Sequence, residues 1–213
     1  MTATAGRFIT LEGIEGVGKT TNIEFVRALI EARGVEVVVT REPGGTPLGE
    51  EIRDLLLDHR HDGMAADTEL LLMFAARAEH IARVIRPALA SGRWVICDRF
   101  TDATFAYQGG GRGIGFERVA LLADWVHRDL QPDLTLLLDL PVETGLGRAG
   151  QRNSADRFER EKIDFFERVR DAYLRLARQE PRRYRVIAAD APLEQVQARL
   201  REVMTEWLAT RIR

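Results

Sequence analysis

Short runs of β-branched residues and leucine recur along the chain, separated by longer stretches with a different hydrophobic spacing. Four runs predict strands, at residues 7–12, 36–41, 93–98 and 134–140. A weaker run at residues 185–189 predicts a fifth. These runs are almost continuously apolar, which is typical of strands that are covered on both faces.

The stretches between the strands predict helices, because their apolar residues return every three or four positions. Residues from Ile23 to Ile30 place their apolar side chains on one helix face, and Gly34 stands where such a helix would end. Pro87 predicts a kink or break in the longest helix. The other predicted helices cover residues 48–57, 67–91, 116–130, 142–151, 160–179 and 193–210.

Alternation of strands and helices predicts an α/β fold with three layers, in which helices cover both faces of a five-stranded parallel sheet. The length of 213 residues suits one domain over residues 1–213. Ligands of such sheets bind at the carboxyl ends of the strands. Candidate functional residues are therefore sought just after each predicted strand.

The charge, cysteine content and apolar segments of the chain limit its possible partners and location. The formal net charge is −2, so no bulk positive field favours nucleic acid or an anionic membrane. The single Cys97 lies in an apolar run and cannot form an internal disulfide, which is compatible with a reducing compartment. No apolar segment is long enough for a signal peptide or a membrane span, so we expect a cytoplasmic protein.

Lysine is scarce in this chain, since only Lys19 and Lys162 are lysines among 31 basic residues. Lys19 belongs to GIEGVGKT, which fits the P-loop pattern G-x-x-x-x-G-K-[ST] between a predicted strand and a predicted helix. Backbone N–H groups of such a loop point at phosphate oxygens, and a compact ammonium reaches the β- and γ-phosphates. The loop predicts binding of a nucleoside triphosphate by Gly13, Ile14, Glu15, Gly16, Val17, Gly18, Lys19 and Thr20, with Thr20 as a Mg²⁺ ligand.

Two further clusters follow the second and third strands. In TREPGGTPLGEEIR, the run Pro-Gly-Gly predicts a turn that places Arg41, Glu42 and Arg53 near the carboxyl edge of the sheet. A solvated turn and helix start is the alternative. In CDRFTDATFAYQGGGRG, Asp98 is placed to orient Mg²⁺, and Arg99 can grip a second phosphate. We expect the glycines at 109–111 to let the chain pass close to a ligand. Hydroxyl, ring and amide groups come from Thr104, Tyr107 and Gln108.

The last two clusters lie in predicted helices or near them. Phe74 and Arg77 share a helix face and suit a flat base with carbonyl acceptors, but a phenylalanine there also suits a core position. Glycines and arginines between residues 145 and 160 predict a mobile lid that closes on a transferring phosphoryl group; a solvated basic helix is the alternative. The arginines are Arg148, Arg152, Arg157 and Arg160.

The sequence resembles the bacterial thymidylate kinases over essentially its whole length. The resemblance rests on GIEGVGKTT, TREPGGTPLGEEIR, the helix with RAEH, VICDRFTDATFAYQGGGRG, PDLTLLLDLP and DRFERE. It implies a P-loop NTPase-type fold, transfer of phosphate from MgATP to dTMP, and a homodimer. Other P-loop nucleotide or nucleoside kinases, and an NTP-dependent switch or binding module that hydrolyses slowly, remain alternatives on the residues alone.

The resemblance also implies a role for each matching residue. Glu15, Asp98 and Glu42 arrange Mg²⁺, water and the acceptor sugar. Arg53 and Arg99 bind the acceptor phosphate. Thr104, Gln108 and Arg77 bind thymine, Phe74 stacks on it, and Tyr107 crowds the 2′ position of the sugar.

Two features depart from the pattern or refine it. The stacking phenylalanine often lies four residues before the arginine, and Met73 occupies that position here. The P-loop interior contains no basic residue, so the resemblance assigns the catalytic cation to the lid. Arg152 is the first candidate for that cation and Arg148 the second.

Overall fold

The computed structural model describes residues 6–150, 157–158 and 161–211. Its sheet contains five parallel strands in the order β2-β3-β1-β4-β5, as the sequence predicts for strand number and direction. The strands are β1 (Phe8–Glu12), β2 (Val37–Arg41), β3 (Trp94–Asp98), β4 (Leu134–Asp139) and β5 (Tyr184–Ala188).

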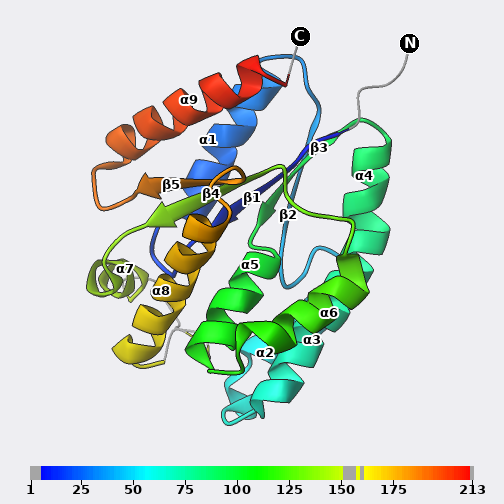
Figure 1. Ribbon diagram of the computed structural model, residues 1–213, viewed down its shortest axis with the longest axis vertical. Coiled ribbons are helices and arrows are strands. Elements are labelled where there is room, and N and C mark those ends of the chain that lie inside the picture. Colours follow the sequence, from blue (N-terminus) through cyan, green and yellow to red (C-terminus); the bar gives the residue numbers. More distant parts are fainter. Residues whose placement is uncertain (1–5, 151–156, 159–160, 212–213) are drawn as a thin grey trace.

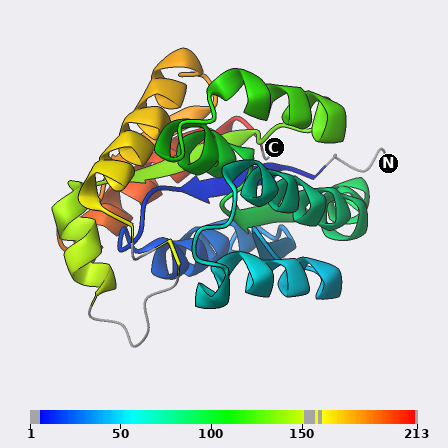
Figure 2. The ribbon, with the colours of Figure 1, turned by 90° about the horizontal axis from the view of Figure 1, so that it is seen from below.

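Helices connect the strands and cover both faces of the sheet. In Figure 2, α8 and α1 lie on opposite sides of the sheet, and α9 packs against α1 and β5. The helices are α1 (Lys19–Glu31), α2 (Pro47–Leu57), η1 (His59–His61), α3 (Ala66–His80), η2 (Ile81–Ile85), α4 (Arg86–Ala90), α5 (Thr101–Thr104), η3 (Phe105–Gly111), α6 (Phe116–His127), α7 (Val142–Ala149), α8 (Ile163–Gln179) and α9 (Leu193–Ala209), most of which are labelled in Figure 1.

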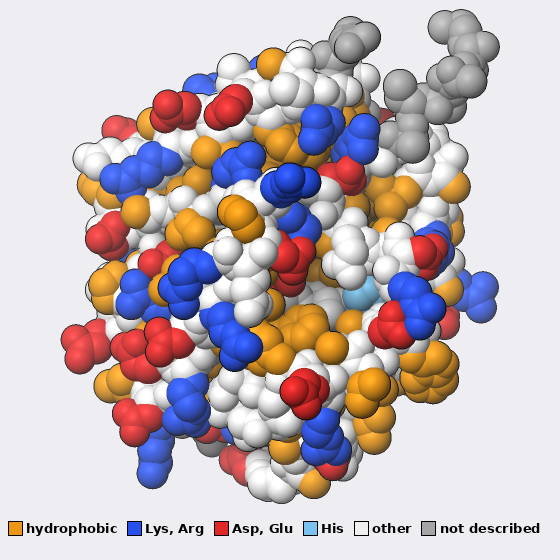
Figure 3. Space-filling model, in the orientation of Figure 1, with side chains coloured by type: hydrophobic (Ala, Val, Ile, Leu, Met, Phe, Trp, Pro, Cys, Tyr) orange, Lys and Arg blue, Asp and Glu red, His pale blue; other side chains and the backbone are white. Residues whose placement is uncertain are grey.

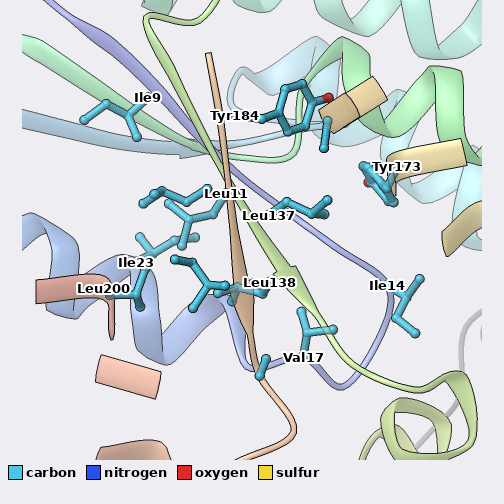
Figure 4. Packing of buried hydrophobic residues seen from close by; sticks show 14 of the residues in the cluster. Ile9, Leu11, Ile14, Val17, Ile23, Leu137, Leu138, Tyr173, Tyr184 and Leu200 are labelled. Atoms are coloured by element: carbon cyan, nitrogen blue, oxygen red, sulfur yellow. The ribbon is translucent and has the colours of Figure 1, made fainter. Parts of the chain in front are cut away.

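The main core lies between the sheet and these helices. Apolar side chains of β1 and β4 meet those of α1 and α9, as Figure 4 shows for Leu11, Leu138, Ile23 and Leu200. Burial of so many large aliphatic side chains stabilises the sheet, at about 25 cal/mol per Å² of apolar surface removed from water. The sheet is therefore a rigid base for the loops at its carboxyl edge.

Strand register brings three of those loops together. Asp98 at the end of β3 is in register with Leu11 of β1 on one side and Arg41 of β2 on the other. Two backbone hydrogen bonds continue the pairing past the strands, from Glu42 N to Asp98 O at 2.9 Å and from Arg99 N to Leu11 O at 3.0 Å. The P-loop, the turn after β2 and the turn after β3 thus share one edge.

The long helix predicted at residues 67–91 departs from regular α geometry earlier than expected. Its first part is α3, and the turn η2 that follows has π-helical hydrogen bonding. Pro87 lies in the first turn of α4, which continues directly from η2, so no N–H is available there for the helical hydrogen bond. A proline ring clashes with the carbonyl four residues before it, here Arg83, so the widened turn accommodates Pro87.

The glycines at 109–111 have a different role from the one predicted. They lie in the π-helical segment η3, and a Cβ atom on Gly110 would come 2.8 Å from Ala172 of α8. A Cβ atom on Gly111 would come 2.6 Å from the Phe165 ring. The expectation of a loop passing close to a ligand is therefore wrong, because Gly110 and Gly111 allow η3 to pack against α8 and Gly109 faces Phe116 of α6.

Candidate active site

A cavity of about 250 Å³ opens at the carboxyl edge of the sheet. The P-loop forms one wall, and residues from α2, α3, α5 and η3 form the other. Its lining consists of Glu15, Gly16, Val17, Gly18, Lys19, Thr20, Glu42, Pro43, Arg53, Leu57, Met73, Arg77, Asp98, Arg99, Phe100, Ala103, Thr104, Tyr107, Gln108 and Phe158. Nearly all the predicted P-loop and acceptor residues thus meet in one cavity.

The P-loop curls tightly between β1 and α1. Gly16 and Gly18 have φ angles of 73° and 87°, in the left-handed region that glycine adopts easily. A Cβ atom on Gly16 would lie 1.9 Å from the carbonyl oxygen of Gly145 in α7, so no larger residue fits there. Gly145, expected to belong to a mobile stretch, instead allows α7 to touch the P-loop.

Lys19 folds back over the loop that precedes it. Its Nζ donates to the carbonyl oxygens of Gly13 and Ile14 at 3.4 and 3.3 Å. Burial and the nearby Arg99 lower the pKa of Lys19, while Asp98 and Glu15 act in the opposite direction. The ammonium is held above the loop, where phosphate oxygens bound by the loop amides would meet it.

Glu15 connects the P-loop to Arg99 and Tyr107 on the opposite wall of the cavity. Its Oε1 accepts a hydrogen bond from Arg99 Nη2 at 2.9 Å, and its Oε2 accepts one from the Tyr107 hydroxyl. The Arg99 guanidinium lies 4.7 Å from the centre of the Tyr107 ring. Burial raises the pKa of Glu15, but Arg99 and Lys19 outweigh it and the net shift is downward. Glu15 therefore carries the charge that fixes Arg99.

Arg99 adopts an unusual backbone conformation at the end of β3. Its φ angle is 69°, a left-handed value that costs energy for a residue with a side chain. Glu12 stabilises this turn, since its Oε1 accepts from Phe100 N at 2.7 Å and its Oε2 accepts from the Tyr173 hydroxyl at 2.8 Å. Glu12 was not predicted from the sequence, because it precedes the P-loop motif and contacts residues distant along the chain.

Thr20 and Asp98 lie where the resemblance expects a Mg²⁺ site. Both line the cavity, and Asp98 Oδ1 is buried without a hydrogen-bond partner among the described residues. A buried acceptor without a donor suits a cation or its water. Within the described residues no group of three or more His, Cys, Asp and Glu side chains could hold a metal ion. Mg²⁺ usually keeps several waters and binds phosphate oxygens, so these two side chains fit its needs.

Glu42, Arg77 and Thr104 form a buried chain at the far end of the cavity. Arg77 Nε donates to Glu42 Oε2 at 2.7 Å, and Arg77 Nη2 donates to Thr104 Oγ1 at 2.9 Å. His80 Nδ1 lies 2.9 Å from the other Glu42 oxygen. Burial raises the pKa of Glu42, but Arg77 and His80 outweigh it and the net shift is downward. His80 was missed by the sequence analysis, as nothing in its spacing marks it as a partner of Glu42.

Met73 and Phe74 are neighbours in the sequence, but their side chains lie on different sides of α3. Met73 lines the cavity, whereas Phe74 is 3% exposed and packs with Leu70 and Val119 between α3 and α6. The structure therefore brings Arg77, but not the Phe74 ring, to the cavity wall. Phe100 and Phe158 supply aromatic surface there instead. Phe158 belongs to the DRFERE motif, which is the signal that could have identified it.

The arginines assigned to phosphate binding and the lid lie in different places. Arg53 lines the cavity and donates from Nη1 to the carbonyl oxygen of Pro43 at 2.9 Å. Arg148 does not line it, and its Nη1 donates to the carbonyl oxygen of Ala189 at 3.0 Å, past the end of β5. Arg152 and Arg160 lie outside the described residues.

A parallel sheet with a P-loop after its first strand, and a polar cavity facing that loop, are typical of P-loop phosphotransferases. The sequence matches the family described as thymidylate kinase over residues 11–200. The chain belongs to the thymidylate kinase family, whose reaction phosphorylates dTMP in nucleotide biosynthesis.

Individual relatives agree with the family match. A thymidylate kinase of Pseudomonas syringae pv. tomato is 60% identical over 203 residues, which are 95% of this chain and 97% of that protein. One from Pseudomonas entomophila is 62% identical over 193 residues, covering 91% and 92% of the two chains. The crystal structure of thymidylate kinase from Ehrlichia chaffeensis superposes with a TM-score of 0.77 at 36% identity, covering 94% of this chain and 99% of that one.

The surface and the helices give two further observations. Lys and Arg side chains are interspersed with Asp and Glu side chains across the face shown in Figure 3. Among the described residues, no helix combines the length and the apolar character that a membrane crossing requires.

Proposed function

We propose that the protein transfers the γ-phosphoryl group of ATP to dTMP in the cavity described above. The observation that carries this proposal is that one cavity combines a P-loop with a group of hydrogen-bonding side chains facing that loop. Lys19 and Thr20 line one wall, while Arg77, Thr104 and Gln108 line the other. An arrangement of this kind brings donor and acceptor together before transfer.

The reaction needs positive charge more than it needs a base. The acceptor oxygen of a nucleoside monophosphate is already anionic at neutral pH, so the protein must bring two polyanions into line and neutralise them. We assign Lys19 to the donor phosphates, and Arg99 with Arg53 to the acceptor phosphate. Thr20 and Asp98 would hold Mg²⁺, which would supply further positive charge to the phosphates when it is bound.

Glu15 completes this assignment as the residue that aims Arg99. A guanidinium without a partner would sample several rotamers, whereas the ion pair with Glu15 and the contact with Tyr107 restrict it. Tyr107 also lines the cavity, and we assign it to crowd the 2′ position of the acceptor sugar. Ribose-containing TMP should then be a poorer acceptor than dTMP.

Release of ADP from MgATP tests the proposal when measured with a panel of acceptors. We expect turnover with dTMP, turnover reduced about 10- to 200-fold with dUMP, which lacks one methyl group, and almost none with thymidine or without acceptor. ADP release that is equal with and without dTMP would contradict the proposal and favour an ATP-hydrolysing switch.

Arg152 is proposed as the lid cation that stabilises the transferring phosphoryl group. By analogy with arginine fingers, Arg152→Ala should lower kcat by about 10³-fold or more while changing KM for dTMP little. Arg178→Ala, an exposed arginine near the end of α8, is the control. An effect of Arg152→Ala on KM alone would remove the catalytic role.

We propose that the protein is a homodimer that associates through α3 and α6. Leu121 and Trp125 of α6 are separated by one helical turn and are 72% and 82% exposed, and Leu71 of α3 is 56% exposed. Sedimentation should give a dimer for the wild type and a monomer for Trp125→Arg. Leu193→Arg changes an exposed apolar residue on α9 and should leave the dimer intact.

We also propose that the reaction takes place in the cytoplasm. This rests on the single buried cysteine, Cys97, which cannot form an internal disulfide, and on the nature of the proposed substrates. Fractionation of cells that express the full chain should recover dTMP-dependent ADP release in the cytosolic fraction. Recovery of that activity with membranes would contradict this assignment.

A further inference from the structure

Glu69 of α3 is a fully buried carboxylate behind the wall of the cavity. Its Oε1 accepts hydrogen bonds from Gln108 Nε2 at 2.8 Å and from Arg112 Nε at 3.2 Å. Its Oε2 accepts from Arg112 Nη2 at 3.2 Å and from Arg157 Nη2 at 2.6 Å. Glu69 is 0% exposed and does not line the cavity, but Gln108 does.

This set of partners fixes the orientation of the Gln108 amide. Two guanidinium groups form ion pairs with Glu69, so both carboxylate oxygens act as hydrogen-bond acceptors. Because the Glu69 carboxylate can only accept, the NH₂ end of the Gln108 amide must face it. The carbonyl end in that place would set two acceptors against each other. The Gln108 oxygen is consequently the end of the amide left for a ligand.

Arg77 offers a hydrogen-bond donor, whereas the Gln108 oxygen offers an acceptor. Its Nε is bonded to Glu42 and its Nη2 to Thr104, whereas Nη1 is buried without a partner among the described residues. Guanidinium nitrogens can only donate. The pocket therefore offers a donor from Arg77 and an acceptor from Gln108.

We propose that Glu69 is a positioning residue for base specificity, because it holds the orientation of the Gln108 amide. In that orientation the cavity accepts a pyrimidine that has a carbonyl beside a ring N–H. It rejects a pyrimidine that has an amino group beside a ring nitrogen without hydrogen. Thymine has the first pattern and cytosine the second. This inference rests on the proposed function, in which Arg77 and Gln108 face the base.

The physical basis is the penalty for leaving buried polar groups unpaired. Cytosine would place its amino group against the Arg77 donor and its ring nitrogen against the Gln108 oxygen. Sites built on such hydrogen bonds reject the wrong partner by about 10⁴- to 10⁵-fold. Turning the Gln108 amide would relieve the clash with the ring nitrogen, but Glu69 opposes that turn.

Glu69→Gln removes this opposition, because a glutamine at position 69 can donate as well as accept. We expect kcat/KM for dCMP relative to dTMP to rise at least about tenfold in Glu69→Gln. Glu79→Gln is the matched control, since Glu79 lies on the same helix and pairs with Arg83 at the surface. The control should keep the wild-type ratio. A Glu69→Gln enzyme that is slower with an unchanged ratio would overturn the inference, since a merely structural role predicts that result.

A variant that exchanges the two side chains provides a second test if Glu69→Gln does not fold. Glu69→Gln combined with Gln108→Glu conserves the net charge and again presents an acceptor oxygen to the cavity. We expect it to prefer dTMP to dCMP as the wild type does, to within about tenfold. Loss of that preference in a folded exchange variant would overturn the inference.

The wild-type measurement separates this inference from the proposed function. A wild type that does not phosphorylate dTMP would overturn the proposed function and the inference with it. A wild type that is active with dTMP, beside a Glu69→Gln variant with an unchanged ratio, would overturn only the role of Glu69.

Discussion

Lys19 and Lys162 have very different surroundings, although they are the only lysines in the chain. Lys19 is held over the P-loop by two backbone carbonyls and lines the cavity. Lys162 lies at the start of α8 and is exposed. This contrast provides an internal control for the role of the ammonium group.

Lys19→Ala should reduce turnover at least about 10³-fold, because it removes the compact charge that reaches the β- and γ-phosphates. Lys162→Ala should leave turnover close to that of the wild type. Steady-state ADP release measures both, with thermal unfolding to establish that the variants are folded. Turnover of Lys19→Ala near the wild-type value would contradict the role of Lys19.

Arg99→Ala should raise KM for dTMP more than it lowers kcat, because it removes a guanidinium assigned to the acceptor phosphate. The partly buried Glu15 then loses its ion pair, so the variant should also unfold at lower temperature. Arg99→Lys should recover part of the affinity, since it restores a charge without the paired geometry. An unchanged affinity for dTMP in Arg99→Ala would count against the assignment.

Several site residues could be predicted from the sequence because a motif fixes their place. Lys19 and Thr20 belong to the P-loop pattern after β1, and Asp98 ends the apolar run of β3. Glu12 and Glu69 could not be predicted in this way. Each acts through partners far along the chain, such as Tyr173 for Glu12 and Arg157 for Glu69, and only packing of the elements brings those partners together.

At the scale of helices and strands, hydrophobic runs predicted the positions of all five strands, since buried parallel strands lack polar alternation. Helix geometry was harder to predict. A glycine in such a segment can allow a turn, leave room for a ligand or let two helices pack closely. The spacing of residues in the sequence does not distinguish these roles. Gly111 and Gly147 show the difference, because one faces α8 and the other faces open space.

Gly111→Ala should destabilise the protein by about 1–3 kcal/mol, because the new methyl group would overpack the contact with α8. A Cβ atom there would lie 2.6 Å from Phe165 and 2.8 Å from Val169. Gly147→Ala has nothing within 4 Å in helix α7 and should be neutral or stabilising by up to about 1 kcal/mol. Denaturant unfolding measures both, and equal stabilities would contradict the packing role of Gly111.

At the scale of the whole molecule, a buried carboxyl links the sheet to α8. Glu12 is 0% exposed at the end of β1 and contacts Tyr173 of α8. Burial, together with the nearby Asp102, raises the pKa of Glu12 to about 8. The folded protein therefore holds a proton that the unfolded chain releases at much lower pH.

Stability should depend on pH through this group. Between the unfolded pKa of about 4.5 and the folded pKa of about 8, the folded state binds more protons, so the free energy of unfolding falls as pH rises. Glu12→Gln removes this titration. Urea unfolding of both proteins from acid to alkaline pH should show the wild type losing stability relative to Glu12→Gln across that window. Parallel stability curves would contradict the assignment.

The order of the strands could not be predicted from the sequence, although their number and direction could. Apolar runs do not encode which strands are neighbours. The order places β1 between β3 and β4, which sets the P-loop beside Asp98. The cavity in which the P-loop faces Arg77 and Gln108 is thus a property of the whole fold.

Binding of a linked dinucleotide tests that shared cavity most directly. Adenosine and thymidine joined through a chain of phosphates should bind with one molecule per chain in calorimetry. ATP alone and dTMP alone should each displace it, because the compound occupies both halves of one cavity. Displacement by only one of the two nucleotides would contradict the account, since it would mean that donor and acceptor sites are separate.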